Sequence, residues 1–157
     1  PGVAAYPLEY VNRPSVIAQI DNMVSINSCV AVDLYGQVAA ESSGVRQISG
    51  TGGQLDFLIG ASASRGGKAF ICMSSVYVDK DGQTHSRVRP QFNGDIITSP
   101  RSQVYFLATE YGVVNLEGRS TWERAEALVS IAHPAFRDYL IKEAEKRKIW
   151  RRSNRIR

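Results

Sequence analysis

The sequence predicts a single domain of the α/β class, and three observations support this prediction. The chain has 157 residues, a length that allows one domain with a substantial core. Its middle carries short apolar, β-branched runs separated by Gly, Pro, Asn and Asp, which is typical of strands. Its ends carry helical signals: Pro14 suits a first helical turn, and apolar residues recur at helical spacing after Ser120.

The first third of the sequence predicts an extended segment, then a short helix and then a β-hairpin. Residues 1–13 are rich in Pro and Tyr, and the helix covers residues 14–20. Residues 29–34 (CVAVDL) read as a strand that ends near Gly36, and residues 37–41 read as its partner. The short connection between the two runs favours a β-hairpin.

Residues 49–68, SGTGGQLDFLIGASASRGGK, hold six of the thirteen glycines. Gly50, Gly52 and Gly53 precede an apolar run, so we predict a glycine turn that leads into a helix. The free N–H groups of such a turn suit a phosphate or a developing oxyanion, and Lys68 adds a cation suited to phosphate. The alternative is a set of tight corners, because the stretch lacks both the dinucleotide fingerprint and a Walker-type ending.

Strands and then helices are predicted for the rest of the chain. Residues 69–78 (AFICMSSVYV) are predicted as the main buried strand, closed by a turn at 79–82. Shorter strands follow over 86–89, 104–109 and 113–116. Ser120 and Glu123 have the spacing of a capping box that begins a helix. Pro134 begins the last helix, with His133 at its entry.

The formal net charge of +4 comes from the end of the chain. Residues 146–157 hold seven Lys or Arg and no acid, which leaves 12 basic against 15 acidic residues elsewhere. We interpret residues 1–145 as the domain and 146–157 as a basic tail, a solvated helix end. Nucleic-acid binding by the tail is the less favoured alternative, because it holds one aromatic residue and no reader motif.

Few residues suggest a metal or nucleophile site. Cys29 and Cys72 lie in apolar runs and are expected to be buried free thiols of a reducing cytoplasm. His85 is expected in an exposed polar loop, far in sequence from His133, so no metal site is predicted. No run of 18 apolar residues and no signal peptide is present, which favours a cytoplasmic location without a membrane partner.

Two acids lie at predicted strand ends. Asp33 and Glu110 are candidates for orienting a ligand, and ion pairs with Arg46 or Arg101 are the structural alternative. Asn12, beside a proline in the pattern Y-V-N-x-P, is an ordinary turn-forming residue on its own.

Several stretches together resemble one known family. They are YVNxP at 10–14, NMVSINSCVAVDLYGQVAAES, SGTGGQLDF, SRGGK at 64–68, TSPRSQVYFLATEYGVVNLEG and IAHPAFRDYL. Their order and spacing resemble the C-terminal domain of the acetyl-CoA hydrolase/transferase family, most of all the 4-hydroxybutyrate CoA-transferases. The resemblance covers residues 9–140 and implies an open, mixed α/β sheet flanked by helices, as in family I CoA-transferases.

The resemblance implies transfer of coenzyme A between short-chain carboxylic acids through a glutamyl-CoA thioester. It implies an oxyanion hole built from Asn12 and the backbone N–H of Gly53. It also implies a wall of the CoA site, and the positions concerned are Cys29, Ser49, Gly50, Gly52, Gly53 and either Lys68 or Lys80. Acyl-CoA would be a substrate, and no tightly bound cofactor is expected.

The family's catalytic glutamate has no counterpart here. Glu9 is too close to Asn12 in sequence to match it, so we expect this chain to be the C-terminal part of a longer, homodimeric enzyme. Its N-terminal domain would supply the glutamate, and this part alone would be inactive. An acetyl-CoA hydrolase and a non-catalytic CoA-binding module remain open as alternatives.

Overall fold

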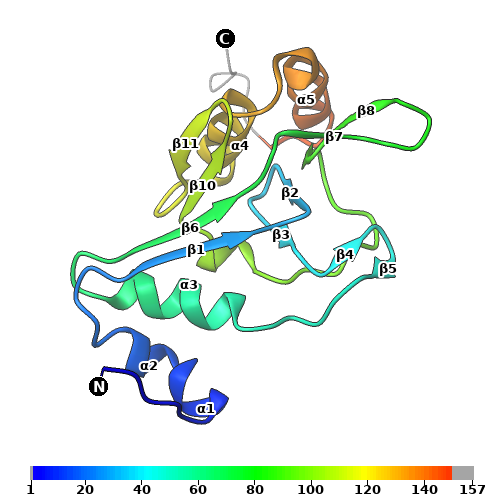
Figure 1. The fold of residues 1–157 in the computed structure, drawn as a ribbon. Coiled ribbons are helices and arrows are strands. Elements are labelled where there is room, and N and C mark those ends of the chain that lie inside the picture. The colour runs from blue at the N-terminus through cyan, green and yellow to red at the C-terminus, as the bar shows by residue number, and fades with distance from the viewer. Residues whose placement is uncertain (1, 150–157) are drawn as a thin grey trace.

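A central sheet of four strands organises the molecule (Figure 1), whose computed structural model describes residues 2–149. The strand order is β1 (Val24–Ser28), β6 (Lys68–Cys72), β10 (Phe106–Thr109) and β11 (Gly112–Asn115). The first three strands are parallel and β11 is antiparallel to β10. This architecture confirms the predicted open, mixed α/β sheet.

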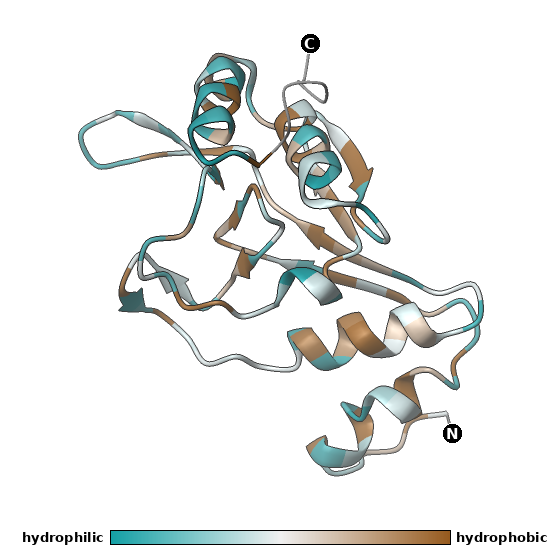
Figure 2. Ribbon diagram, turned by 180° about the vertical axis from the view of Figure 1, so that it is seen from behind, coloured by the Kyte–Doolittle hydropathy of each residue, from teal (hydrophilic) through white to brown (hydrophobic). Residues whose placement is uncertain are grey.

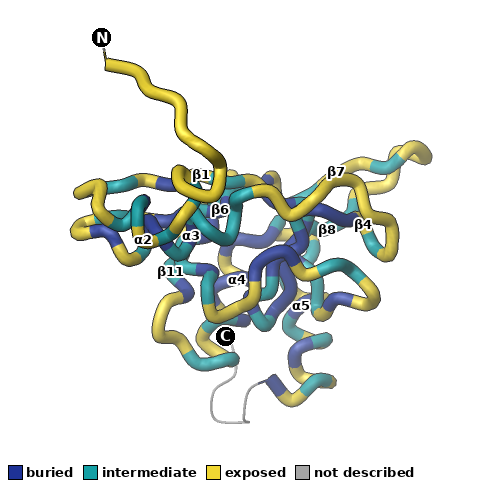
Figure 3. The backbone as a smooth tube through the Cα atoms, turned by 90° about the horizontal axis from the view of Figure 1, so that it is seen from below, coloured by how far each residue is buried: buried dark blue, intermediate teal, exposed yellow. Residues whose placement is uncertain are grey.

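Three helices pack on one side of this sheet or against one another. α3 (Gln54–Ala63) packs on β1 and β6, α4 (Thr121–Ser130) packs on β11, and α5 (Pro134–Lys146) packs on α4. Seen from behind (Figure 2), α3 and α4 lie in front of the strands. The core lies between these helices and the sheet, where Leu58, Ile71, Leu107 and Leu128 are completely buried (Figure 3).

The predicted helix starts are confirmed. Ser120 and Glu123 form the capping box of α4, with the Ser120 N–H donating to Glu123 Oε2 at 2.8 Å. α5 begins at Pro134, and His133 Nδ1 accepts a hydrogen bond from the N–H of Ala135 at 3.2 Å. Local sequence chemistry therefore sets both boundaries.

Smaller sheets complete the fold. β2 (Ala31–Asp33) pairs with β3 (Val38–Ala39) in the predicted hairpin and with β9 (Val88–Arg89) in parallel. Gly36 makes the hairpin turn with φ at +88°. β4 (Ser42–Ser43) pairs with β5 (Arg46–Gln47), and β7 (Val76–Val78) pairs with β8 (Thr84–Ser86). A 3₁₀ turn, η1, covers Arg101–Gln103.

The single strand predicted over residues 69–78 is wrong. Residues 68–72 belong to the central sheet, whereas β7 belongs to a separate, largely exposed hairpin. The chain leaves the sheet at Ser75, whose N–H donates to Glu110 Oε2 at 2.8 Å. The Glu110 side chain, just after β10, thus accepts the hydrogen bond that a backbone carbonyl of β10 would accept if the strand pairing continued.

His85 does not lie in a polar loop, as the sequence suggested. It is part of β8, half-buried, and its Nε2 lies 2.6 Å from Asp79 Oδ2. At the other end of the chain α5 ends at Lys146, where Lys146 and Arg147 both pair with Glu143. Residues 150–157 of the predicted basic tail lie outside the described residues.

Candidate active site

A close contact between two helices positions the N-terminal segment. α1 (Leu8–Val11) and α2 (Pro14–Ile17) follow an extended stretch, and α2 packs on α3. Gly60, in the middle of α3, makes this possible: a Cβ there would lie 2.6 Å from Ile17 Cβ and 3.1 Å from the Pro14 carbonyl oxygen. Ile17 is only 2% exposed, so its burial fixes α2 on α3.

This packing brings Asn12 onto Gly53. Gly53 is the N-cap of α3, and a Cβ on it would overlap the amide nitrogen of Asn12. Gly52 precedes it with φ at +56°, a left-handed conformation that favours glycine. The Asn12 amide has no hydrogen-bond partner among the described residues, so its N–H groups remain available to a ligand.

The helix N-terminus at Gly53 is equally available. No side chain caps α3, and the first N–H groups of a helix have no partner within the helix. Those N–H groups carry the positive end of the helix dipole, which favours an anion or a developing oxyanion. Asn12 and the start of α3 thus bring N–H groups without hydrogen-bond partners among the described residues next to each other.

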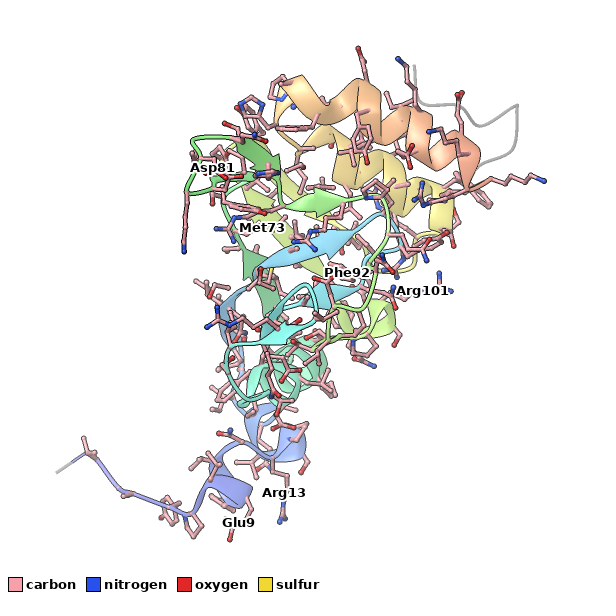
Figure 4. All side chains as sticks on the ribbon, turned by 90° about the vertical axis from the view of Figure 1, so that its right-hand side faces the viewer. Glu9, Arg13, Met73, Asp81, Phe92 and Arg101 are labelled. Carbon is pink, nitrogen blue, oxygen red and sulfur yellow. The ribbon has the colours of Figure 1, made fainter. Side chains whose placement is uncertain are left out.

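An open cavity of about 750 Å³ adjoins this contact. Residues of the N-terminal segment and of the glycine turn line it: Leu8, Glu9, Asn12, Arg13, Pro14, Thr51, Gly52, Gly53 and Asp56. Figure 4 shows Glu9 and Arg13 on the N-terminal segment, with side chains that point away from the body. A cavity of this size is large enough for a small organic group.

Six of these lining residues were not predicted as site residues from the sequence, namely Leu8, Glu9, Arg13, Pro14, Thr51 and Asp56. Their place depends on how α2 crosses α3, which is a long-range contact. Gly60 inside the predicted helix was the available signal, since a glycine there marks a close backbone approach.

Ser49 and Gly50 precede the cavity in the same exposed turn. Ser49 Oγ donates to the Gly50 carbonyl oxygen at 3.1 Å, and the Ile48 N–H donates to the Glu41 carbonyl oxygen at 2.8 Å. The bond to Glu41 holds the start of the turn beside the residue that precedes β4, and both Ser49 and Gly50 are exposed to solvent.

The two candidate lysines lie far from Asn12. Lys68 follows the C-terminal end of α3, and the ten residues of α3 place it about 15 Å from Gly53 along the helix axis. Lys80 is exposed in the β7–β8 turn. Figure 4 shows its neighbour Asp81 at the opposite end of the molecule from Glu9 and Arg13.

Cys29 is buried rather than open to solvent. Its Sγ lies 3.5 Å from Met73 Sδ, and burial raises the pKa of the thiol to about 12. Cys72 is half-buried, so the expectation that both thiols are buried holds only for Cys29.

The two acids at strand ends have structural partners. Asp33 accepts hydrogen bonds from Gln37 Nε2 at 2.7 Å and from the N–H of Tyr35 at 3.1 Å, while burial raises its pKa. Glu110 accepts from the hydroxyl and the N–H of Ser75, and the hydroxyl contact lowers its pKa. Neither forms an ion pair with Arg46 or Arg101 in the described part of the chain, so that alternative is wrong.

Within residues 2–149, no group of three or more His, Cys, Asp or Glu side chains is placed to hold a metal ion. None of the described helices is long and apolar enough to cross a membrane.

The fold and the site together define a class of protein: an α/β domain in which an asparagine amide lies against an uncapped helix N-terminus beside an open cavity. The sequence matches, over residues 1–144, the family described as acetyl-CoA hydrolase/transferase C-terminal domain. The chain belongs to this family and represents its C-terminal domain.

Curated relatives agree with this assignment. The chain is 56% identical over 156 residues to the butyryl-CoA:acetate CoA-transferase of Anaerostipes caccae, covering 99% of this chain and 35% of that protein. It is 51% identical over 148 residues to the 4-hydroxybutyrate coenzyme A transferase of Clostridium kluyveri, covering 94% and 34%. The chain therefore spans about a third of the length of these relatives.

Solved structures show the same fold. RipA from Yersinia pestis aligns with a TM-score of 0.83 at 42% identity, covering 92% of this chain and 32% of that one. A 4-hydroxybutyrate CoA-transferase from Porphyromonas gingivalis aligns with a TM-score of 0.70 at 42% identity, covering 90% and 31%.

Proposed function

We propose that this chain is the C-terminal domain of a cytoplasmic, homodimeric acyl-CoA:carboxylate CoA-transferase and supplies its oxyanion hole. The observation that carries the proposal is the contact of the unpartnered Asn12 amide with Gly53 at the uncapped start of α3, beside the cavity. The relatives at 56% and 51% identity, named as CoA-transferases, support the substrate class of acyl-CoA and short-chain carboxylate.

The proposed reaction uses a glutamate of the N-terminal domain. Its carboxylate attacks the acyl-CoA thioester, which releases CoA thiolate and leaves a mixed anhydride. The thiolate attacks the glutamyl carbonyl of this anhydride, which releases the donor carboxylate and forms a glutamyl-CoA thioester. The acceptor carboxylate then reverses both steps and leaves as the new acyl-CoA, so the glutamate is regenerated.

The chain described here contributes to each of these steps in the same way. Every attack forms a tetrahedral intermediate whose oxygen carries a negative charge. Two donors, the Asn12 amide and the Gly53 N–H, would stabilise that charge, and the packing of Asn12 against Gly53 supports their acting together. Such preorganised donors stabilise the transition state more than the ground state.

The residues expected to hold CoA divide into two groups under this proposal. Ser49, Gly50, Gly52 and Gly53 lie in the turn beside the cavity and would contact the thioester end of the substrate. Cys29, Lys68 and Lys80 are apart from it, so a role for either lysine requires the distant, phosphate-bearing end of CoA. No tightly bound cofactor is needed for this chemistry.

The intact mass after incubation with acetyl-CoA tests the proposal. We expect a covalent CoA adduct on the complete polypeptide that contains this domain and none on residues 1–157 alone. Borohydride reduces a glutamyl thioester and releases CoA, so it should remove the adduct.

Other outcomes would contradict the proposal. An adduct on residues 1–157 would place the nucleophile in this chain, with Glu41 and Glu110 the first to substitute. The absence of an adduct on both forms would favour a non-catalytic CoA-binding module. An adduct that water removes as fast as acetate does would indicate a hydrolase.

A further inference from the structure

The glycine turn, residues 49–53, depends on contacts outside it for its position. It belongs to the connection between β5 and α3 (Figure 1), and residues 49–52 are exposed to solvent. Gly52 has a left-handed φ of +56°, and no side chain caps α3 at Gly53. Because glycine leaves the backbone more freedom than any other residue, the rest of the fold has to fix the direction of the N–H groups in this turn.

Two adjacent buried residues, Thr98 and Ser99, support the two ends of this turn. Their side chains are buried, with Thr98 7% and Ser99 0% exposed. Ser99 is fixed to β3 through its backbone: its N–H donates to the Val38 carbonyl oxygen at 3.1 Å, and its carbonyl oxygen accepts from the Val38 N–H at 3.0 Å. Ser99 is therefore a rigid support for any side chain that contacts it.

Backbone hydrogen bonds hold the entry to the turn. Thr98 Oγ1 accepts from the Ala40 N–H at 2.9 Å and donates to Glu41 Oε1 at 3.3 Å. The carbonyl oxygen of Glu41 accepts from the N–H of Ile48 at 2.8 Å and from that of Ser49 at 3.3 Å. The position of the entry thus depends on several bonds and not on one side chain.

A side-chain hydrogen bond holds the exit from the turn. Gln54 is the first residue of α3 and follows Gly53 directly, and its Nε2 donates to Ser99 Oγ at 3.0 Å. This bond joins residues 45 positions apart in the sequence. Since one peptide unit separates the two residues, the placement of Gln54 also sets the direction of the Gly53 N–H.

We propose that Gln54 is a positioning residue of the oxyanion hole and that it acts through Ser99. This inference rests on the proposed function for the role of Gly53. Asn12 reaches Gly53 through the packing of α2 on α3, whereas Gln54 ties the same end of α3 to the strand layer around β3. Without the bond to Ser99 the start of α3 would shift relative to Asn12, and a displacement of about 1 Å can cost about 100-fold in rate.

A purely structural role for Gln54 is the competing explanation, because a buried hydroxyl such as that of Ser99 needs a partner. Loss of the bond would then lower stability and leave catalysis unchanged. Gln37 offers a matched comparison: its Nε2 donates to Asp33 Oδ2 at 2.7 Å, and Asp33 is completely buried. That bond lies in the β2–β3 hairpin and not in the cavity beside Asn12.

Steady-state kinetics of the complete polypeptide test the inference. Gln54→Met and Gln37→Met each keep about the length of the side chain and remove its donor. We expect Gln54→Met to lower kcat at least tenfold with KM changed less than twofold, and Gln37→Met to leave both within twofold. Ser99→Ala should lower kcat by a similar factor to Gln54→Met. The double variant should be no slower than either single variant, because both changes break the same bond.

Hydrogen exchange provides a readout that does not require activity. The Phe57 N–H donates to the Gly53 carbonyl oxygen at 3.1 Å, so its exchange reports on the first turn of α3. We expect this N–H to exchange at least tenfold faster in Gln54→Met than in Gln37→Met.

Three results would overturn the inference, and they differ in what they leave of the proposed function. Equal exchange of the Phe57 N–H in the two variants would mean that Gln54 does not hold the start of α3. An unchanged kcat in Gln54→Met, together with a low kcat in Gly53→Ala, would retain the oxyanion hole and remove the positioning role. An unchanged kcat in both, or a complete polypeptide that forms no CoA adduct, would remove the oxyanion hole and the positioning role with it.

Discussion

The two ends of α3 each bring an asparagine against a glycine, yet their surroundings differ. At the start of α3, Asn12 meets Gly53 beside an open cavity. After its end, Asn22 meets Gly66, where a Cβ would lie 2.5 Å from Asn22 Oδ1. Both contacts come from the segment that leads into β1, so one helix carries the same pair of residue types twice.

Hydrogen bonding distinguishes the two ends. After the end of α3 hydrogen bonds tie the chain down: the Asn22 N–H donates to the Arg65 carbonyl oxygen at 2.8 Å, and Ser64 Oγ donates to the Ile20 carbonyl oxygen at 2.6 Å. The side-chain amides of Asn12 and Asn22 are alike in having no hydrogen-bond partner among the described residues. The difference lies in the backbone, because the first N–H groups of α3 have no such partners within the described residues. The paired end holds the loop before β1 on α3, whereas the start of α3 is the end at which we propose that the substrate binds.

Gly67→Ala should have the largest effect on stability. A Cβ at Gly67 would overlap the Ala61 carbonyl oxygen and lie 2.8 Å from Ser64 Cβ and 3.0 Å from the Met23 carbonyl oxygen. Two of these atoms are backbone and cannot rotate away, so we expect a loss of about 3 kcal/mol in the free energy of unfolding. Urea unfolding of the complete polypeptide measures this loss. A loss below about 1 kcal/mol would contradict the tight packing of this end.

Gly53→Ala should do the opposite of Gly67→Ala: it should lower kcat strongly and change stability little. The new methyl group would displace only the end of the Asn12 side chain, which can rotate, so stability should change by less than about 1 kcal/mol. The oxyanion donors would be separated, and removal of one such donor typically costs about 100-fold in kcat. Steady-state kinetics of CoA transfer measure the effect, with KM little changed. An unaltered kcat would exclude an oxyanion role for this contact.

Local signals in the sequence were sufficient for much of the fold. The capping box at Ser120 and Glu123, the proline that begins α5 and the hairpin around Gly36 each depend on residues close in sequence. The glycine turn before α3 was predicted for the same reason. The division of residues 69–78 was not predictable, because it depends on Glu110, which lies 35 residues after Ser75.

The site was predictable only in part. A resemblance to a family proposed that Asn12 and Gly53 act together, and the structure places them in contact. Nothing local to residues 9–13 shows that they reach Gly53, because the contact depends on Ile17 packing on Gly60. Glu9 and Arg13 became wall residues of the cavity through that same long-range packing.

Gly60→Ala should lower both the free energy of unfolding and kcat, each by less than the glycine variants at the two ends of α3. The new Cβ would lie 2.7 Å from Ile17 Cγ2 and push α2 away from α3, which we expect to cost about 1–2 kcal/mol. Because α2 also positions Asn12, kcat should fall about tenfold, and a misplaced catalytic group accounts for a loss of this order. Ile17→Leu, which removes the Cγ2 branch that the new Cβ would meet and keeps the volume of the side chain, should restore part of kcat in the double variant. A stability loss without any change in kcat would separate the helix contact from the site.

Asp21→Asn should have the smallest effect, although it removes an ion pair at the structural end of α3. Asp21 pairs with Arg65, and their side chains are 50% and 85% exposed. Exposed pairs contribute little because water and salt screen them, so we expect a change below about 0.5 kcal/mol in the free energy of unfolding and no change in kcat. Urea unfolding at low and at high salt measures the difference. A loss above about 1 kcal/mol that vanishes at high salt would show that charge, rather than the packing around Gly66 and Gly67, stabilises this end of the helix.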